Sequence, residues 1–329
     1  MSDPIVPLFS LVNGEGAGAL LAAAAGDVAG GASPIGYSAL IQQATVVAYH
    51  LLNRNEISGP DLAAEWAELG ADGSNPSVYR MASEDFDQWL ENVNTSAQIR
   101  VRRPDCEPAV RAFPAGIWFR RDPSQLVTAA LEISRLTHMD ATTAVASASL
   151  AGAAAAAAFG QVGRDFLAAV REITSVAAAR VAGETEGFID AAAAPAFVAQ
   201  VRELTSFSPT SESQISKTLI GEADLGPTGP AWVIAAIKLA ADGNRDPAEQ
   251  IGHAAHVGGS LLGGMVGALL GARAGLRAWP WKVPNSTWFA ELGVRMVSGN
   301  RETRDLPVPY YVEETLTHGI ERDHRRPFG

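Results

Sequence analysis

Cysteine is almost absent from this chain of 329 residues, which contains only Cys106. A single cysteine excludes an intramolecular disulfide and a thiolate metal cluster built from one chain. Charged residues are also few, at 19%, whereas hydrophobic residues reach 47%. This balance excludes a disordered or fibrous protein. The sequence therefore predicts a folded globular protein suited to a reducing interior.

Basic residues are outnumbered by acidic ones. The 25 Lys and Arg residues against 36 Asp and Glu residues give a formal net charge of −11. A negative field repels polyanions, so we expect neither nucleic acid nor an acidic membrane surface as a partner. The segment Met1–Pro4 lacks the basic start of a signal peptide, and we expect a cytoplasmic protein.

The hydrophobic pattern predicts an all-α protein, a compact helical bundle rich in Ala and Gly. Runs of alternating β-branched residues are few, whereas capping residues before apolar helical patterns are frequent. Asp122 and Asp246 each precede a proline, which favours a helix start. Asp140 can cap the alanine-rich run 141–159 in the same way. These signals predict long, well-marked helices.

Two apolar runs, 141–159 and 257–272, are predicted to be buried helices. Both consist mostly of Ala, Gly and Ser, which gain little from transfer into lipid. In the helix predicted from Asp246 to Arg273, glycine recurs every four residues, so one face is bare backbone against which a second helix can press. These glycines are Gly259, Gly263, Gly267 and Gly271.

The sequence contains no linker strong enough to divide it into domains. We expect a single helical domain over residues 1–299. Within it, residues 205–230 are rich in Ser, Thr, Gly and Pro and predict a surface insertion with one short helix near Ile215–Ile220. Residues 300–329 are charged and interrupted by proline, without apolar periodicity, and predict an extended C-terminal tail.

Four segments, in order along the chain, resemble the ADP-ribosylglycohydrolase family. They are Gly18–Gly30, Ala109–Gly116, Leu136–Asp140 and the stretch from Gly267 to Pro280. They are similar to the opening helix of the family, its Ala-Met-Arg-Ala-x-Pro-Leu-Gly segment, its Leu-Thr-His-x-Asp segment and its closing helix. The resemblance implies an all-helical fold and an enzyme that removes ADP-ribose from proteins or small molecules.

The resemblance also implies a binuclear magnesium site, but its ligands are replaced in this chain. The family has a Thr-Asp-Asp triplet where this chain has Ser38–Ile41 before Gln42, and an Asp-x-Asp-Thr segment where it has Gly258–Leu261. Magnesium needs such carboxylate ligands. We therefore expect no metal and no other cofactor.

Cleavage of an N-glycosidic bond without metal requires a well-placed carboxylate. The candidates are Glu15 at the start of the first helix, Asp27, and Glu107 just ahead of Arg111. Asp27 is placed best by the resemblance, and its alternative role is to cap a turn. Glu107 replaces part of a family substrate loop, and its alternative is a glutamate in a surface loop.

Two histidines on the predicted central helix are further candidates. His253 and His256 are three residues apart, and Glu249 precedes them on the same face. They can act as acid and base groups, with His256 the preferred one, or form a different metal site. The alternative is a pair of hydrogen-bonded histidines between helices. We interpret His138 as a structural residue.

Several residues are candidates for ligand binding. Arg111 can bind either a phosphate or a buried carboxylate. Tyr37, with Trp279, Trp281 and Trp288, can form a stacking wall for a ring or close the edge of the core. The complete set of expected binding residues is Glu15, Tyr37, Ser38, Gln42, Arg111, Gly258, Ser260 and Trp281.

Two functions remain open. The preferred one is a metal-independent hydrolase that acts on an ADP-ribosyl or other nucleoside or nucleotide N-glycoside. The alternative is a pseudoenzyme that binds an ADP-ribose-like ligand or a partner protein. The sequence predicts neither the substrate nor the oligomeric state.

Overall fold

The protein is seen in a computed structural model that describes residues 14–31, 36–70, 77–93, 100–184, 188–205, 229–277, 282–298, 303 and 305–324. These residues form thirteen α-helices and one 3-10 helix. They are α1 (Gly14–Ala29), α2 (Ala39–Arg54), α3 (Gly59–Glu68), α4 (Glu84–Asn92), α5 (Glu107–Trp118), α6 (Pro123–Thr137), α7 (Ala141–Ala158), α8 (Gly163–Gly183), α9 (Ala194–Glu203), α11 (Ala231–Ala241), α12 (Pro247–Ala274), η3 (Gly275–Arg277), α13 (Ser286–Ser298) and α14 (Pro309–His324).

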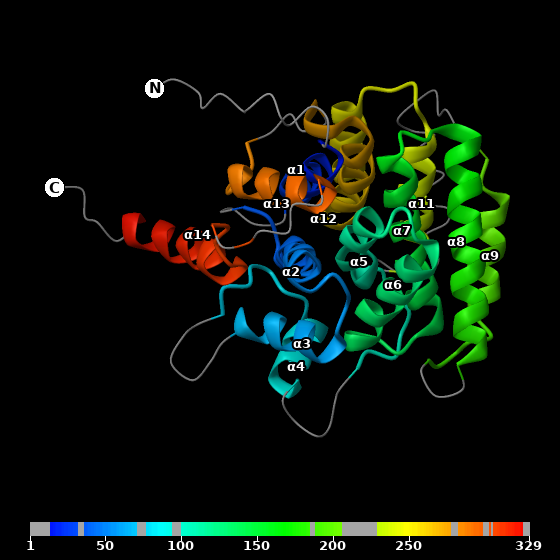
Figure 1. Ribbon diagram of the computed structural model, residues 1–329, viewed down its shortest axis with the longest axis horizontal. Helices are drawn as coiled ribbons and strands as arrows, with labels where there is room; N and C mark the ends of the chain where they lie inside the picture. The colour runs from blue at the N-terminus through cyan, green and yellow to red at the C-terminus, as the bar shows by residue number, and fades with distance from the viewer. Residues whose placement is uncertain are drawn as a thin grey trace.

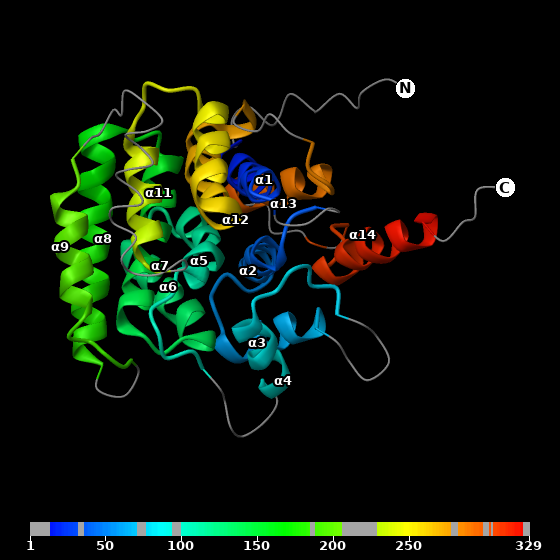
Figure 2. The same ribbon diagram turned by 180° about the vertical axis from the view of Figure 1, so that it is seen from behind.

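The predicted all-α fold class is confirmed. In the described part of the chain, strand-like pairing is limited to two isolated bridges. Helices α1, α2, α5, α7 and α12 occupy the middle of the molecule, and α8 with α9 forms one end of its long axis (Figures 1 and 2). Helix α14 lies at the opposite end in both views. The first helix, α1, therefore packs in the centre against α12, from the C-terminal part of the chain.

Glycines bring α1 and α12 into backbone contact. A Cβ on Gly267 would lie 2.0 Å from the carbonyl oxygen of Ala22, and one on Gly26 would lie 2.0 Å from that of Gly263. A Cβ on Gly271 would clash in the same way with α1. The predicted glycine stripe is thus confirmed from Gly263 onward, and its partner is α1, which carries glycines of its own.

Helix α12 is not continuous, in contrast to the prediction. Gly258 (φ −122°, ψ 16°) and Gly259 (φ 62°, ψ −159°) have non-helical backbone. The positive φ of Gly259 is one that L side chains rarely adopt, so this glycine serves the kink rather than the packing stripe. The kink brings the backbone of Ser260 against the end of α1, where a Cβ on Gly30 would lie 2.2 Å from the Ser260 nitrogen.

The three capping aspartates hold helix starts as predicted. Asp122, Asp140 and Asp246 each accept a hydrogen bond from a backbone N–H of the first turn of their helix. The helices α7 and α12 are long and apolar enough to cross a membrane, but residues 141–157 of α7 are all buried and α12 is mostly buried. Contacts between helices therefore account for their composition, as predicted.

The expectation of an extended tail over residues 300–329 is wrong for much of that segment. Residues Pro309–His324 form the helix α14. Tyr310, Val312 and Leu316 pack against the core, and Glu313 is fully buried. The sequence pattern did not predict this helix because its fully buried residue is the charged Glu313, and its apolar residues do not form a regular stripe. The predicted insertion at 205–230 and its short helix lie almost entirely outside the described residues.

Candidate functional site

Asp27 lies in the last full turn of α1 and is 1% exposed. Its Oδ2 accepts a hydrogen bond from the backbone N–H of Ser38 (2.6 Å), and its Oδ1 accepts one from the Ser38 hydroxyl (2.9 Å). Burial raises the pKa of Asp27 to about 7, although the hydrogen bonds from Ser38 and the charge of Arg80 oppose this rise. Asp27 is thus a carboxyl group that titrates near neutral pH.

Ser38 is placed by the start of α2. It is the N-cap residue of this helix, and its hydroxyl oxygen also accepts a hydrogen bond from the N–H of Leu40 at 3.3 Å. The residues that replace the early family triplet therefore lie directly beside Asp27. Residues 258–261, which replace the second metal-binding segment of the family, reach the end of α1 at the α12 kink. There Gly30 lies against the backbone of Ser260. The structure brings Asp27, Ser38 and the backbone of Ser260 to one end of α1.

A second buried cluster surrounds the carboxylate of Glu313 from α14. Its Oε1 accepts a hydrogen bond from the hydroxyl of Tyr37 at 2.8 Å, and its Oε2 accepts one from Nε2 of Gln42 at 3.0 Å. Nη2 of Arg80 lies 2.7 Å from the same Oε2. The side chains of Arg80 and Glu313 are 4% and 0% exposed, so this is a buried ion pair.

The residues around Glu313 are also held by one another. Nε of Arg80 donates to the carbonyl oxygen of Tyr37 at 2.9 Å, and its guanidinium carbon lies 4.6 Å from the centre of the Tyr37 ring. Oε1 of Gln42 accepts a hydrogen bond from the backbone N–H of Arg80 at 2.9 Å. Asn285 donates to the Tyr37 hydroxyl at 3.1 Å. We call Tyr37, Gln42, Arg80 and Asn285 the carboxylate cradle.

Sequence reasoning missed Arg80, Asn285 and Glu313. No motif surrounds Arg80, and Glu313 stands in a segment without apolar periodicity. Tyr37 and Gln42 were predicted as binding residues, and they do converge, but on a carboxylate of the same chain. Burial raises the pKa of Glu313, while Arg80, Tyr37 and Gln42 lower it.

The residues at the family's two metal positions do not fit a magnesium pair. Magnesium prefers carboxylate and water oxygens in octahedral geometry. Here the Ser38 hydroxyl donates a hydrogen bond to Asp27, and the late positions 258–261 hold two glycines, a serine and a leucine. The nearby buried cation is the guanidinium of Arg80. Among the described residues, no group of three or more His, Cys, Asp and Glu side chains is arranged to hold a metal.

Glu107 is not a surface-loop residue, contrary to the alternative considered above. It begins α5, its side chain is 13% exposed, and its Oε2 lies 2.9 Å from Nη2 of the buried Arg111. The same oxygen accepts a hydrogen bond from the hydroxyl of Ser83 at 2.9 Å. Burial raises the pKa of Glu107, and the charge of Arg111 opposes this. Glu107 therefore neutralises a buried arginine.

Arg111 is 0% exposed, so it is placed for a buried carboxylate rather than for a phosphate from solvent. Its Nη1 donates to the hydroxyl of Thr137 at 2.7 Å, which also lies 2.8 Å from Nδ1 of His138. Its guanidinium carbon lies 5.0 Å from the centre of the Phe86 ring. Burial lowers the pKa of His138 well below its usual range. His138 thus has a structural place at the junction between α6 and α7.

Glu15 lies far from Asp27 along α1, and the α12 candidates are at least partly exposed. Glu15 starts α1, and twelve residues at about 1.5 Å of rise each separate it from Asp27 by roughly 18 Å. His256 and Glu249 are exposed, and His253 is partly buried. Trp288 is buried, and its indole N–H donates to the carbonyl oxygen of Pro307 at 2.9 Å, so it closes a core edge.

Trp279 and Trp281 lie outside the described residues, so their predicted part in a stacking wall stays a prediction.

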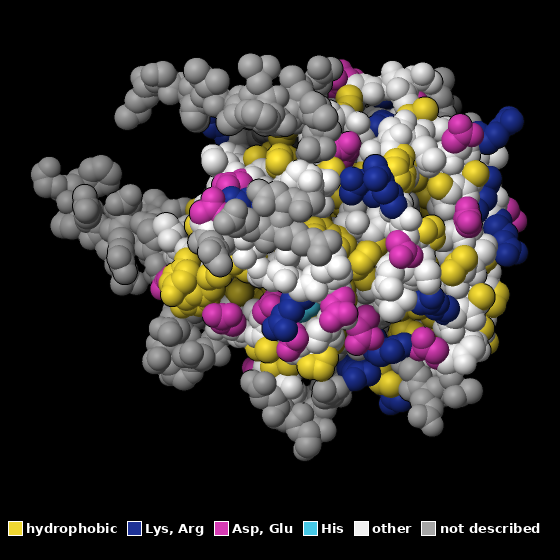
Figure 3. Space-filling view, in the orientation of Figure 1, with side chains coloured by type: hydrophobic (Ala, Val, Ile, Leu, Met, Phe, Trp, Pro, Cys, Tyr) yellow, Lys and Arg dark blue, Asp and Glu magenta, His cyan; other side chains and the backbone are white. Residues whose placement is uncertain are grey.

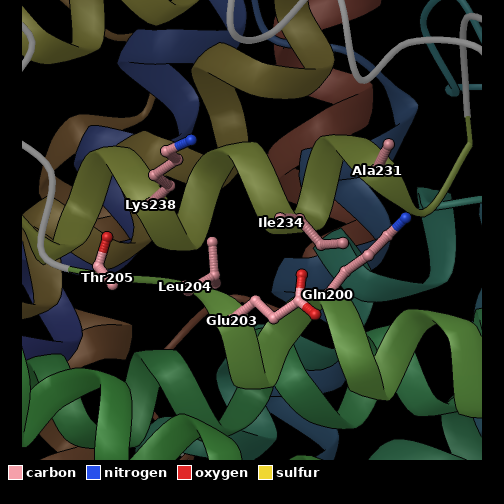
Figure 4. A pocket seen from close by; sticks show the side chains of 7 residues that line it. All are labelled: Gln200, Glu203, Leu204, Thr205, Ala231, Ile234 and Lys238. Carbon is pink, nitrogen blue, oxygen red and sulfur yellow. The ribbon is translucent and has the colours of Figure 1, made fainter.

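A cavity of about 270 Å³ lies between α9 and α11, and none of its lining residues is a predicted site residue (Figure 4). Its lining residues are Gln200, Glu203, Leu204, Thr205, Ala231, Ile234 and Lys238. They flank residues 206–228, which lie outside the described residues. We assign this cavity no part in the site.

The model of the ADP-ribosylglycohydrolase family matches residues 15–305. The chain belongs to the ADP-ribosylglycohydrolase family. A solved structure of an "ADP-ribosylglycohydrolase-related protein complex" is similar to this family member with a TM-score of 0.62 and 20% sequence identity. The similarity covers 87% of this chain and 98% of the other, and at this identity it shows the fold alone. No curated protein matches the chain.

Proposed function

We propose that this ADP-ribosylglycohydrolase family member is catalytically silent and acts by binding. The observation that carries the proposal is the carboxylate of Glu313, which fills the cradle of Tyr37, Gln42 and Arg80 beside the positions of the early family triplet. Because the two charges neutralise each other, the cradle has no unpaired charge for a substrate or a cation.

The two carboxylates that the hydrolase hypothesis requires, Asp27 and Glu107, support the same conclusion, because both bind other groups of the same chain. Asp27 accepts two hydrogen bonds from Ser38 and is almost fully buried. Glu107 is paired with Arg111. A general acid or base must come within hydrogen-bond reach of the reacting group, and the burial of Asp27 opposes such contact.

Metal-independent hydrolysis is the second candidate, and one observation favours it. The pKa of Asp27 is about 7, a value suited to general acid and base catalysis at neutral pH. For this function, α14 or the kink of α12 would have to move and admit an ADP-ribosyl or nucleoside N-glycoside to Asp27. Movement of α14 away from the cradle, or of the α12 kink, is therefore what the second candidate requires and the first does not.

The experiment is incubation of the full chain with NAD, ADP-ribosyl-arginine and simple nucleosides, with excess chelator and separately with Mg²⁺. We expect no release of nicotinamide, arginine or base above the rate without protein. Titration with ADP-ribose in the same buffers shows whether a nucleotide-like ligand binds. Turnover in chelator that Asp27→Asn abolishes would overturn the proposal in favour of the metal-independent hydrolase.

We further propose that the protein is cytoplasmic and that its partner is not a nucleic acid. A net charge of −11 supports a partner other than nucleic acid, and a single buried cysteine suits a reducing cytoplasm. The similar solved structure is named as a protein complex, and we extend to this chain the proposal that it binds a partner protein. Size-exclusion chromatography with light scattering of the chain purified from its native cells tests this extension.

A further inference from the structure

We infer that the cradle of Tyr37, Gln42, Arg80 and Asn285 is a carboxylate-binding site whose resident ligand is Glu313. This goes beyond the proposed function, because it assigns a binding site and the chemical class of its ligand. It does not require that the chain be catalytically silent. The ligand is a carboxylate, either free or carried by a helical peptide.

The donors of the cradle match a carboxylate. Each oxygen of Glu313 has its own hydrogen-bond donor: Tyr37 for Oε1 and Gln42 for Oε2. Arg80 adds a positive charge 2.7 Å from Oε2. Hydrogen bonds to an ionised group are the strong ones, and a buried carboxylate needs both of its oxygens satisfied.

The body of the protein holds these donors independently of α14. Nε2 of Gln42 also donates to the carbonyl oxygen of Val78 at 2.9 Å, and Oε1 of Gln42 accepts from the Arg80 backbone. The Tyr37 ring packs edge-on against Phe289, with ring centres 4.9 Å apart. These contacts fix the donors before a carboxylate arrives, as a preorganised receptor requires.

Helix α14 adds partly buried contacts beside the buried carboxylate of Glu313. Other contacts of α14 with the body include the partly buried Tyr310, Val312 and Leu316, of which Leu316 lies beside Gly36, and the Thr317 hydroxyl, 3.2 Å from Nη1 of Arg80. Tyr311 is 63% exposed, and hydrophobic side chains are visible over the start of the helix (Figure 3). In Figure 1, the helix extends away from the bundle. Glu313 is therefore a fully buried charged contact of a helix at the edge of the molecule.

The first arm of the test uses a free carboxylate. The full chain with Glu313→Ala keeps the three groups that face the carboxylate, those of Tyr37, Gln42 and Arg80, and gains space for acetate. We expect acetate, compared with chloride at equal ionic strength, to raise the melting temperature of this variant by a few degrees. The rise should level off as the acetate concentration increases. The wild type, the neighbouring control Glu314→Ala and the double variant Arg80→Gln/Glu313→Ala should show no such rise. Absence of a saturable acetate effect in Glu313→Ala would overturn the assignment.

The second arm uses a carboxylate on a helix and does not depend on the folding of Glu313→Ala. Leu316→Ala loosens α14 while the cradle stays intact. A labelled peptide covering residues 306–324 should bind the Leu316→Ala chain at least about tenfold more tightly than the same peptide with Glu313→Gln. Equal affinity of the two peptides would overturn the assignment for helical ligands. If acetate stabilises Glu313→Ala but the two peptides bind equally well, the ligand class is restricted to free carboxylates.

Discussion

The guanidinium of Arg80 and the carboxylate of Glu313 form a buried ion pair, with Nη2 and Oε2 2.7 Å apart. The pair joins the loop before α4 to the last helix of the chain, beside Ser38, which stands where the family has its first metal-binding triplet. Arg80 and Glu313 thus neutralise each other at the end of the fold where the family resemblance implies a metal.

Removal of one member of this pair should destabilise the protein strongly. Glu313→Gln or Arg80→Gln leaves an uncompensated buried charge, which costs about 3–5 kcal/mol of unfolding free energy. The double variant Arg80→Met/Glu313→Leu should lose less than the sum of the two single losses. Urea denaturation of all variants measures this coupling, and strict additivity would contradict the contact.

Asp27 should give the protein a distinct pH dependence. Its pKa is about 7 in the folded state against an ordinary value of 3.8, so the folded state binds more protons between these two values. Stability therefore falls as pH rises through this window. Relative to Asp27→Asn, the wild type should lose about 2–3 kcal/mol between pH 5 and pH 8. Denaturation of both chains at the two pH values measures this, and a constant difference would contradict the raised pKa.

Glu107 should matter for stability because it neutralises Arg111. Glu107→Gln is expected to lower the unfolding free energy by about 3 kcal/mol, since Arg111 is 0% exposed and keeps its charge. The control Glu84→Gln, at an exposed position of α4, should stay within about 0.5 kcal/mol. Equal effects of the two substitutions would show that Glu107 is not paired in solution.

The close approach of α1 and α12 leads to a prediction for Gly267. A Cβ there would lie 2.0 Å from the carbonyl oxygen of Ala22, so Gly267→Ala should force the helices apart at a cost of about 3 kcal/mol or more. The control Gly183→Ala has no atom within 4 Å of the added Cβ and should be nearly neutral. Thermal unfolding of the two variants compares them, and a stable Gly267→Ala chain would contradict this packing.

The sequence was informative where local chemistry decides the structure. The capping aspartates, the alanine run of α7 and the stripe from Gly263 to Gly271 follow from hydrogen bonding and side-chain size, and each was predicted correctly. The kink of α12 was not, because two adjacent glycines are compatible with a helix until the neighbouring α1 is known.

The candidate site was predictable only in part. Ser38 and Asp27 were named as site residues, and the structure places them in hydrogen-bond contact. Arg80 and Glu313 were not named, because a buried ion pair between segments far apart in the chain has no local pattern. Such a pair becomes visible only when α14 is placed on the bundle.

Isothermal titration calorimetry of the full chain with Mg²⁺ measures whether the replaced metal positions still bind a cation. We expect no saturable binding at magnesium concentrations found in cells, and no difference between the wild type and Ser38→Ala. Saturable binding of Mg²⁺ that Ser38→Ala or Ser260→Ala removes would contradict this expectation, because the site would then hold a metal beside the Arg80–Glu313 pair.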